Sequence, residues 1–307
     1  MCLDGELYDL SSPTVMGIVN LTPDSFHADS RVTSIKELTG AVRRHLDGGA
    51  QIIDIGGYSS RPGAADIDEK HEKLRVLWGL ECIRQSFDKQ LPISIDTFRS
   101  SVVREAVEHF GPVIVNDITA GEGDPDMLDT VAHYKLPYIA MHMRGTPATM
   151  SKMTDYDDVT AAVIAYFAER MELFSQKHLG DVIIDPGFGF AKTVVQNFEL
   201  LRRLDEFDIF DKPILVGLSR KTMIWRTLGI DASRALNGTT ALHMAALERG
   251  ANILRVHDSR EAMQAVRLFE AIHGKVTPEM IADRPHNPEI AVARKSTTRP
   301  TRKRLRL

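Results

Sequence analysis

Polar and charged residues that could do chemistry stand directly after short apolar runs, where a buried strand would end. They combine carboxylates, amides, imidazoles and cations, and in chain order they are Asn20, Asp54, Asp96, Asn116, Asp117, His142, Asp185, Lys221, Arg255 and His257. A cap or a loop hydrogen bond could explain any one of them, and for Asp54 and Asp117 this structural role is at least as good an explanation as a chemical one. Caps alone do not need such variety, so the set as a whole indicates a binding or catalytic site.

Arg255 is the most informative of these residues because it lies inside an apolar run, Ile253–Val256. A charge is costly in such a place unless it is paired. Arg255 and His257 are two residues apart, so on a strand both side chains point to the same face. We therefore expect Arg255 to have a carboxylate partner and to share a site with His257.

The same ring of residues could hold a metal ion. His142, His257, Asp96 and Asp185 could in principle bind zinc, but they lack the close spacing of zinc motifs, which disfavours that ion. The amide oxygen of Asn20 suits a Mg²⁺ ion that bridges to a substrate phosphate, because Mg²⁺ prefers oxygen ligands.

Two loops rich in glycine, proline and hydroxyl groups follow the first two apolar runs. They are Thr22–Asp29 and Gly56–Gly63, and the second contains Arg61 beside two serines, a combination that suits a phosphate. Glycine and proline at their ends would act as hinges, so both loops look like lids over a site.

A third loop, Gly187–Thr193, resembles half of a nucleotide-binding P-loop. That motif needs a glycine directly before its lysine, and here Ala191 precedes Lys192, so we reject this interpretation. The glycines of this loop are better explained by a flat substrate that approaches the backbone closely.

The elements that must position these residues follow from a regular alternation. Eight short apolar runs are separated by segments of helical periodicity, and the runs are Val15–Val19, Ile52–Ile55, Ile93–Ile95, Val113–Val115, Tyr138–Met141, Val182–Ile184, Ile214–Val216 and Ile253–Val256. Such a pattern predicts an α/β protein folded as a single (β/α)8 TIM barrel, with a doubly wound open sheet as the alternative. In a barrel the carboxyl ends of the strands form one face, which would gather the polar residues together.

Length and composition fit one large globular domain. The chain has 307 residues, 43% of them hydrophobic and 26% charged, and its two cysteines, Cys2 and Cys82, argue against a disulfide framework. No apolar run is long enough to span a membrane, and the first residues lack the pattern of a signal peptide. We therefore expect a cytoplasmic protein.

Charge is distributed unevenly along the chain. Residues 284–307 contain eight Lys or Arg and one Glu, a balance of +7, so a net charge of −4 leaves −11 on the remainder. We expect a barrel over residues 1–280 and a disordered basic tail over residues 284–307. The tail could tether the protein to RNA or membrane, but a solvated appendage is the simpler interpretation, and the acidic body argues against a nucleic-acid surface on the barrel.

Taken together, several stretches of the chain resemble dihydropteroate synthase, the folate-pathway family that sulfonamides inhibit. The matching stretches occur in the family's order and are Met16–Phe26, Gly56–Gly63, Ile95–Thr97, Asn116–Ile118, Asp185–Phe190, Ser219–Lys221 and Arg255–Asp258. The resemblance implies a TIM barrel, a homodimer, Mg²⁺ and the joining of 6-hydroxymethyl-7,8-dihydropterin diphosphate to 4-aminobenzoate with release of pyrophosphate. An SN1-like path is implied, because the pterin methylene can bear positive charge.

The same resemblance assigns roles to individual residues. Those implied around the pterin are Asp96, Asn116, Asp185, Gly189, Phe190, Lys221 and Arg255, and those around the diphosphate are Ser60, Arg61, Arg255 and His257. Those implied around 4-aminobenzoate are Phe26, Arg61, Pro62, Phe190, Lys221 and Thr222. Asn20 is the implied Mg²⁺ ligand, and the implied catalytic set is Asn20, Ser60, Arg61, Asp96, Lys221, Arg255 and His257.

Departures from the family pattern keep two other functions open. Ala28 stands where the family usually has an aspartate in the first loop, Ser60 replaces a threonine, and Ala191 replaces a glycine. A non-catalytic pterin-binding paralogue would tolerate Ala28 but would not need Arg61 or Lys221. A methyltetrahydrofolate–corrinoid methyltransferase would explain the pterin residues but not the diphosphate set.

Overall fold

The computed structural model describes residues 1–21, 34–58, 67–88 and 90–275. The chain divides into two compact units, Met1–Val266 and Arg267–Leu307. The strands are β1 (Cys2–Leu3), β2 (Glu6–Leu7), β3 (Thr14–Asn20), β4 (Ile52–Gly56), β5 (Ile93–Asp96), β6 (Ile114–Asp117), β7 (Tyr138–Met141), β8 (Val182–Asp185), β9 (Leu215–Val216) and β10 (Ile253–Val256). The boundary between barrel and tail, predicted near residue 280, falls outside the described residues.

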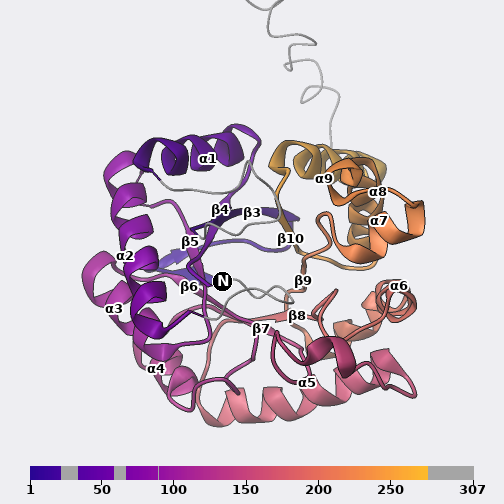
Figure 1. Cartoon of the computed structure of the whole chain (residues 1–307), viewed down its shortest axis with the longest axis horizontal. Coiled ribbons are helices and arrows are strands. Elements are labelled where there is room, and N and C mark those ends of the chain that lie inside the picture. Colours follow the sequence, from indigo (N-terminus) through magenta and orange to yellow (C-terminus); the bar gives the residue numbers. More distant parts are fainter. Residues whose placement is uncertain (22–33, 59–66, 89, 276–307) are drawn as a thin grey trace, which may run out of the picture. The chain divides into compact units, whose positions relative to one another are not determined.

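Eight of these strands form a barrel of parallel strands (Figure 1). The sheet runs in the order β8-β7-β6-β5-β4-β3-β10-β9. A parallel bridge between Ile184 and Ile214, together with the hydrogen bond from Ile184 N to Pro213 O at 2.9 Å, joins the two ends of this sheet. This closure confirms the predicted TIM barrel and rules out the open doubly wound sheet.

Helices connect successive strands and lie outside them (Figure 1). The α-helices are α1 (Ile35–Asp47), α2 (Glu69–Ser86), α3 (Ser100–Phe110), α4 (Met127–Tyr134), α5 (Val159–Gln176), α6 (Val194–Arg202), α7 (Thr222–Leu228), α8 (Leu236–Leu247) and α9 (Ser259–Ile272). Short 3-10 helices are η2 (Met150–Lys152), η3 (Leu204–Phe210) and η4 (Ala232–Arg234). Along the described ranges, no helix is long and apolar enough to cross a membrane.

All eight predicted strands are present, and Tyr138–Met141 and Ile253–Val256 have the predicted limits. Four others extend one residue further at one or both ends, the run Val113–Val115 becomes Ile114–Asp117, and Ile214–Val216 shortens to Leu215–Val216. Gly111 is the C-terminal cap of α3. It has φ 83° and ψ −175°, a region open to glycine, and its N–H bonds to Val107 O. The sequence did not predict the antiparallel pair of β1 and β2.

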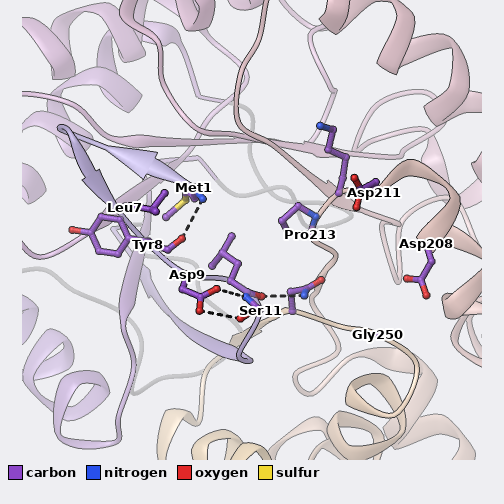
Figure 2. A pocket seen from close by; sticks show the side chains of 12 residues that line it. Met1, Leu7, Tyr8, Asp9, Ser11, Asp208, Asp211, Pro213 and Gly250 are labelled. Carbon is purple, nitrogen blue, oxygen red and sulfur yellow. Dashed lines mark hydrogen bonds between the residues drawn. The ribbon is translucent and has the colours of Figure 1, made fainter.

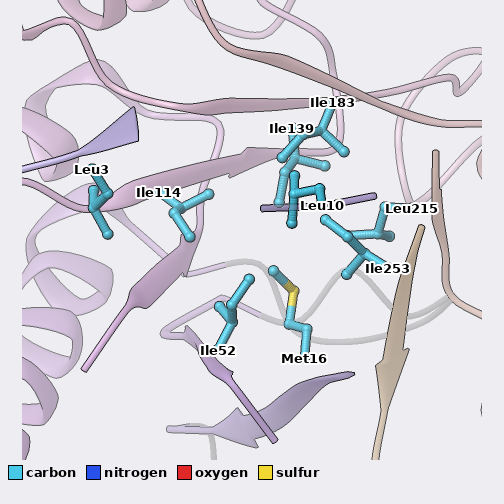
Figure 3. Close-up of a cluster of buried hydrophobic side chains, with 9 residues drawn as sticks. All are labelled: Leu3, Leu10, Met16, Ile52, Ile114, Ile139, Ile183, Leu215 and Ile253. Carbon is cyan, nitrogen blue, oxygen red and sulfur yellow. The ribbon is translucent and has the colours of Figure 1, made fainter. Parts of the chain in front are cut away.

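A layer of apolar side chains fills the amino-terminal end of the barrel (Figure 3). It comprises Met16, Ile52, Ile114, Ile139, Ile183, Leu215 and Ile253, with Leu3 and Leu10 packed against it. The segment that carries β1 and β2 therefore covers this end of the barrel. The packing of Leu3 and Leu10 on the apolar layer stabilises this short hairpin.

Strand geometry converts this apolar layer into a polar one further along. Side chains two residues apart point to the same side of a strand. The inward positions two residues beyond Ile52, Ile114, Ile183 and Ile253 are therefore Asp54, Asn116, Asp185 and Arg255. The barrel interior is thus apolar at its amino-terminal end and charged at its carboxyl end.

Helix α8 buries a histidine against the barrel. His243 is 2% exposed, and neither of its ring nitrogens has a protein hydrogen-bond partner among the described residues. Burial lowers the pKa of His243 to about 4, and only the charge of Asp258 opposes this shift. The ring is therefore neutral near pH 7 in the folded protein.

Acid should destabilise the fold through this histidine. The folded pKa of His243 lies below the unfolded value, so between about pH 6.5 and pH 4 the unfolded chain binds more protons. Stability is then complete above the unfolded pKa and falls with pH through this window, by up to about 3 kcal/mol. Urea unfolding at pH 5 and pH 7.5 should show a smaller difference between the two pH values for His243→Leu than for the wild type. The exposed His109→Gln is the control, and an equal pH dependence in His243→Leu would show that this ring does not titrate as expected.

Candidate functional site

The centre of the site is Arg255, whose guanidinium lies between two carboxylates. Its Nε donates to Asp54 at 2.7 Å, and its Nη2 donates to Asp96 at 2.7 Å. Burial alone would lower the pKa of Arg255, but these two carboxylates outweigh it and raise the pKa above its ordinary value. The partner that the sequence analysis required for Arg255 is therefore a pair of aspartates on β4 and β5.

Asn116 lies beside this ion pair. It is 3% exposed, its register partner on β5 is Asp96, and its Nδ2 donates to the two oxygens of Asp54 at 3.4 and 3.5 Å. Asp54 is itself 1% exposed and is occupied by Arg255 and Asn116. The role of Asp54 is thus to hold the side chains of Arg255 and Asn116 in position.

Asp117 is the other aspartate for which the sequence allowed a purely structural role. Its side chain points away from Arg255 and Asn116. Its carboxylate accepts from Thr119 N, Thr119 Oγ1 and Gly121 N at 2.7 to 2.8 Å, and from the Tyr138 hydroxyl at 2.7 Å. These bonds organise the turn after β6, so Asp117 has the structural role and Asn116 faces the site.

Asp185 ends β8 with a buried carboxylate. It is 7% exposed, and its Oδ1 accepts from Gly187 N at 2.8 Å. Burial raises the pKa of Asp185, while the charges of Lys221, Arg255 and Lys192 oppose this shift. Asp185 is therefore a buried carboxylate held in place at the carboxyl end of β8.

Lys221 follows β9, which lies next to β8 where the barrel closes, and its charge acts on Asp185. Its Nζ donates to Phe188 O and lies 4.7 Å from the centroid of the Phe190 ring. Burial lowers the pKa of Lys221 to about 8, although Asp185 opposes this. Gly189 gives the lysine room, because a Cβ there would lie 3.1 Å from Lys221 Cδ.

Ser219 and Arg220, the two residues that precede Lys221, fix the position of its backbone. Ser219 Oγ lies 3.0 Å from His257 Nδ1 and also accepts from His257 N at 3.2 Å. Arg220 has φ 54° and donates from Nε and Nη2 to Asp258 at 2.8 and 2.9 Å. The motif Ser219–Lys221 is therefore tied to the end of β10, which brings His257 and Lys221 to the same face.

Asn20 ends β3, and its register partner is Gly56, which pairs in turn with Asp96. Asn20 is half-buried on an inward position four residues beyond Met16. An amide oxygen in this place fits Mg²⁺ as a single protein ligand, since Mg²⁺ commonly takes its other ligands from water and phosphate. In the parts of the chain that the structure describes, no three His, Cys, Asp or Glu side chains group as metal ligands.

Several predicted residues fall outside the described ranges, namely Phe26, Ser60, Arg61 and Pro62, together with Ala28 of the first loop. Thr222 is described; it is exposed and begins α7.

The sequence did not predict a role for Glu72 or for its partner Arg99, which contacts Tyr58 and Ile67 at the ends of two described segments. Glu72 is fully buried, accepts from Thr97 Oγ1 at 2.5 Å and pairs with Arg99. Arg99 donates to Ile67 O at 3.0 Å, and its guanidinium lies 5.5 Å from the Tyr58 ring. The motif residue Thr97 is therefore structural. A buried Glu in a helix gave no signal in the sequence, because its partner lies 27 residues away.

The polar residues at the carboxyl face form a pattern of donors and acceptors. Acceptors are provided by Asp96, Asp185 and the Asn116 oxygen, whereas Lys221 and Arg255 are cationic donors. Such a set suits a flat heterocycle whose edge carries both donors and acceptors, and the cations with His257 suit an attached anion.

A separate groove lies at the opposite, amino-terminal ends of the strands (Figure 2). It encloses about 780 Å³ and is lined by Met1, Leu7, Tyr8, Asp9, Leu10, Ser11, Asp208, Asp211, Lys212, Pro213, Gly250 and Asn252. None of the predicted site residues lines it, so its size does not bear on the chemistry of the carboxyl face.

Comparison with known proteins agrees with this geometry. A family model described as pterin binding enzyme matches residues 16–257. A dihydropteroate synthase of Escherichia coli strain K12 is 42% identical over 269 residues, which cover 87% of this chain and 94% of that protein.

Solved structures give the same result. A dihydropteroate synthase of Yersinia pestis in complex with a sulfonamide drug superposes with a TM-score of 0.84 and 36% identity, covering 89% of this chain and 99% of the other. A Xanthomonas albilineans dihydropteroate synthase with 4-aminobenzoic acid gives 0.80 and 36%, covering 88% and 96%. The chain therefore belongs to the pterin-binding enzymes, and within them to the dihydropteroate synthases.

Proposed function

We propose that this chain joins 6-hydroxymethyl-7,8-dihydropterin diphosphate to 4-aminobenzoate, giving 7,8-dihydropteroate and pyrophosphate. One observation carries the proposal: Asp96, Asn116, Asp185, Lys221 and Arg255 meet at the carboxyl face of the barrel of a dihydropteroate synthase family member. The relatives with a sulfonamide and with 4-aminobenzoic acid support the choice of the second substrate.

The pterin end of the site recognises a flat edge. The Asp185 carboxylate accepts two parallel N–H bonds from the pterin, as a carboxylate does from any such fork. Asn116 matches a donor and an acceptor, and Lys221 donates to a ring acceptor atom. Arg255 lies against the ring face while Asp96 holds it in place.

The diphosphate end stabilises the departing charge. Arg255 and His257 bind its oxygens together with Ser60 and Arg61 of the second loop. Asn20 would hold a Mg²⁺ ion, which would supply further positive charge to the leaving group. Preorganised charge of this kind is where most of the rate acceleration lies. Departure of pyrophosphate leaves positive character on the pterin methylene, so bond breaking leads the reaction.

The second substrate needs placement more than activation, because its aniline nitrogen is already nucleophilic. Phe190, Lys221 and the exposed Thr222 line its side of the site. The family resemblance implies that Phe26, Arg61 and Pro62, which lie outside the described residues, also contact this substrate. The carboxylate of 4-aminobenzoate lies near Thr222, at the start of α7.

Pyrophosphate release by the purified protein tests this function. We expect release only when dihydropterin diphosphate, Mg²⁺ and 4-aminobenzoate are all present. Lys221→Ala and Asp185→Ala should each lower the rate by about 100-fold or more, because each removes a group aimed at bound substrate. Lys177 and Asp129 form an exposed ion pair, so Lys177→Ala and Asp129→Ala are matched controls that should keep the wild-type rate. Pterin binding without release would favour the non-catalytic paralogue, and absence of pterin binding would overturn the proposal.

The role of Asn20 predicts a change in metal dependence. Asn20→Leu should raise the Mg²⁺ concentration for half-maximal activity by about tenfold or more, the scale seen when even outer partners of metal ligands are lost. Binding of 6-hydroxymethylpterin, which carries no diphosphate, should be unchanged in calorimetry without Mg²⁺. An unaltered Mg²⁺ titration in this variant would remove Asn20 from the metal site.

We also propose that the protein is a homodimer. Consecutive elements that pack on one another, η3 with α6 and α6 with α7, expose the large apolar side chains Ile209, Val195 and Leu228. Exposed apolar groups on neighbouring elements are typical of protein interfaces.

Light scattering should give twice the chain mass of 34.2 kDa for the wild type. Leu228→Glu should shift the protein toward monomer, because a charge would be buried at the interface. Leu74→Glu on α2 is the matched control, since Leu74 is 58% exposed and Leu228 is 53% exposed. A wild-type mass of one chain would contradict the dimer.

A further inference from the structure

Lys192 is a buried cation to which neither the motifs nor the proposed chemistry gives a role. It lies in the loop after β8 and is 8% exposed. Its Nζ contacts His142 Nδ1 at 2.9 Å, Gly187 O at 3.0 Å and Phe190 O at 3.1 Å. A buried lysine is retained only where its partners compensate for its lost hydration.

The partners of Lys192 match an ammonium group. A protonated lysine has three N–H donors and no acceptor, and the three contacts of Lys192 are all to acceptors once His142 Nδ1 is unprotonated. Burial, with the charges of Lys192 and Arg144, lowers the pKa of His142 to about 2, so this ring is neutral. Burial lowers the pKa of Lys192 to about 7, and the charge of Asp185 opposes this shift. The contacts favour the ammonium, because a neutral amine would leave one of the three acceptors without a proton.

The two carbonyls held by Lys192 belong to the turn that shapes the pterin site. Gly187 donates from its N–H to Asp185 and accepts at its carbonyl from Lys192, so it is fixed from both sides. Gly187 has φ 74°, and a Cβ there would lie 2.0 Å from His142 O, which shows how closely this turn packs against the end of β7. Movement of Gly187 would therefore move the Asp185 carboxylate.

The other carbonyl is that of Phe190, whose ring lies 4.7 Å from Lys221 Nζ. Lys192 thus acts on two groups that are proposed to touch substrate. It acts on Asp185 through Gly187, and on Phe190 through the carbonyl of that residue. Its charge, together with those of Lys221 and Arg255, also opposes the rise in the pKa of Asp185 that burial causes.

We propose that Lys192 is a positioning residue for the pterin: backed by neutral His142, its ammonium fixes the Gly187–Phe190 turn and so sets the Asp185 carboxylate and the Phe190 ring. This inference rests on the proposed function, because it takes Asp185 as the group that accepts from the pterin. The His142 side chain acts on the turn through Lys192, and its backbone N–H donates to Asp185 O at 3.0 Å.

Calorimetry of the full chain with 6-hydroxymethylpterin separates positioning from bulk stability. Lys192→Met removes all three donors and keeps the side-chain length, and it should weaken pterin binding by about 10- to 100-fold. In the double variant Lys192→Met/His142→Leu the side-chain partner also becomes apolar, so the urea midpoint should recover the part of the loss that comes from the unpaired His142 ring. The Gly187 and Phe190 carbonyls still lack their donor, so pterin binding should stay weak. Lys177→Met, on the surface, should change neither quantity.

A pH profile of pterin binding gives a second readout. The groups that face Asp185 are Lys192, Lys221 and Arg255, and those that face Lys192 are Asp185, Lys221, Arg144 and His142. Removing one cation raises the pKa of the Asp185 carboxyl further. The loss of binding on the acid side should therefore begin at a higher pH in Lys192→Met than in the wild type.

The outcomes distinguish the two levels of the argument. A wild-type protein that does not bind pterin overturns the proposed function and this inference with it. Wild-type binding that is equalled by Lys192→Met, with the same acid limb, overturns the inference alone. Recovery of pterin affinity in the double variant in step with its stability would also overturn it, since Lys192 would then act only on the fold.

Discussion

The carboxyl end of the barrel depends on one paired charge, the partly buried guanidinium of Arg255. A strand interior cannot hold it alone, and the pair of carboxylates from Asp54 and Asp96 makes it tolerable. Because Asp54 also receives the amide of Asn116, residues of four strands, β4, β5, β6 and β10, are joined through polar contacts at the carboxyl end of the barrel. The same contacts orient the groups that the chemistry uses, so folding and substrate recognition draw on one network.

The two-residue period of a strand explains how one barrel is both stable and reactive. Its first inward positions are apolar and close-packed under the covering hairpin, and its next ones carry charge. Burial at one end holds the strands rigidly, which lets the polar groups at the other end stay preorganised. The loop after β8 extends this design, because Gly187 and Gly189 permit approaches that a Cβ would block.

Much of this arrangement could be predicted from the sequence because it rests on local pattern. The eight apolar runs and the polar residue after each gave the barrel and the membership of Asn116, Asp185, Lys221 and Arg255 in one face. What could not be predicted were partners distant in the chain: Asp54 for Arg255, and His142 for Lys192. A pairing that depends on closure of the barrel leaves no spacing in the sequence.

The double duty of the polar network has an evolutionary consequence. A substitution at Arg255 or Asn116 would remove a proposed contact with the substrate. It would also leave the buried Asp54 without one of its hydrogen-bond partners, so such changes carry a cost in folding. Thr222 is exposed at the start of α7 and is not bound into that network. Under the proposed function, analogues of 4-aminobenzoate would therefore select changes near Thr222 at little cost in folding, whereas changes in the proposed pterin half of the site would also destabilise the fold.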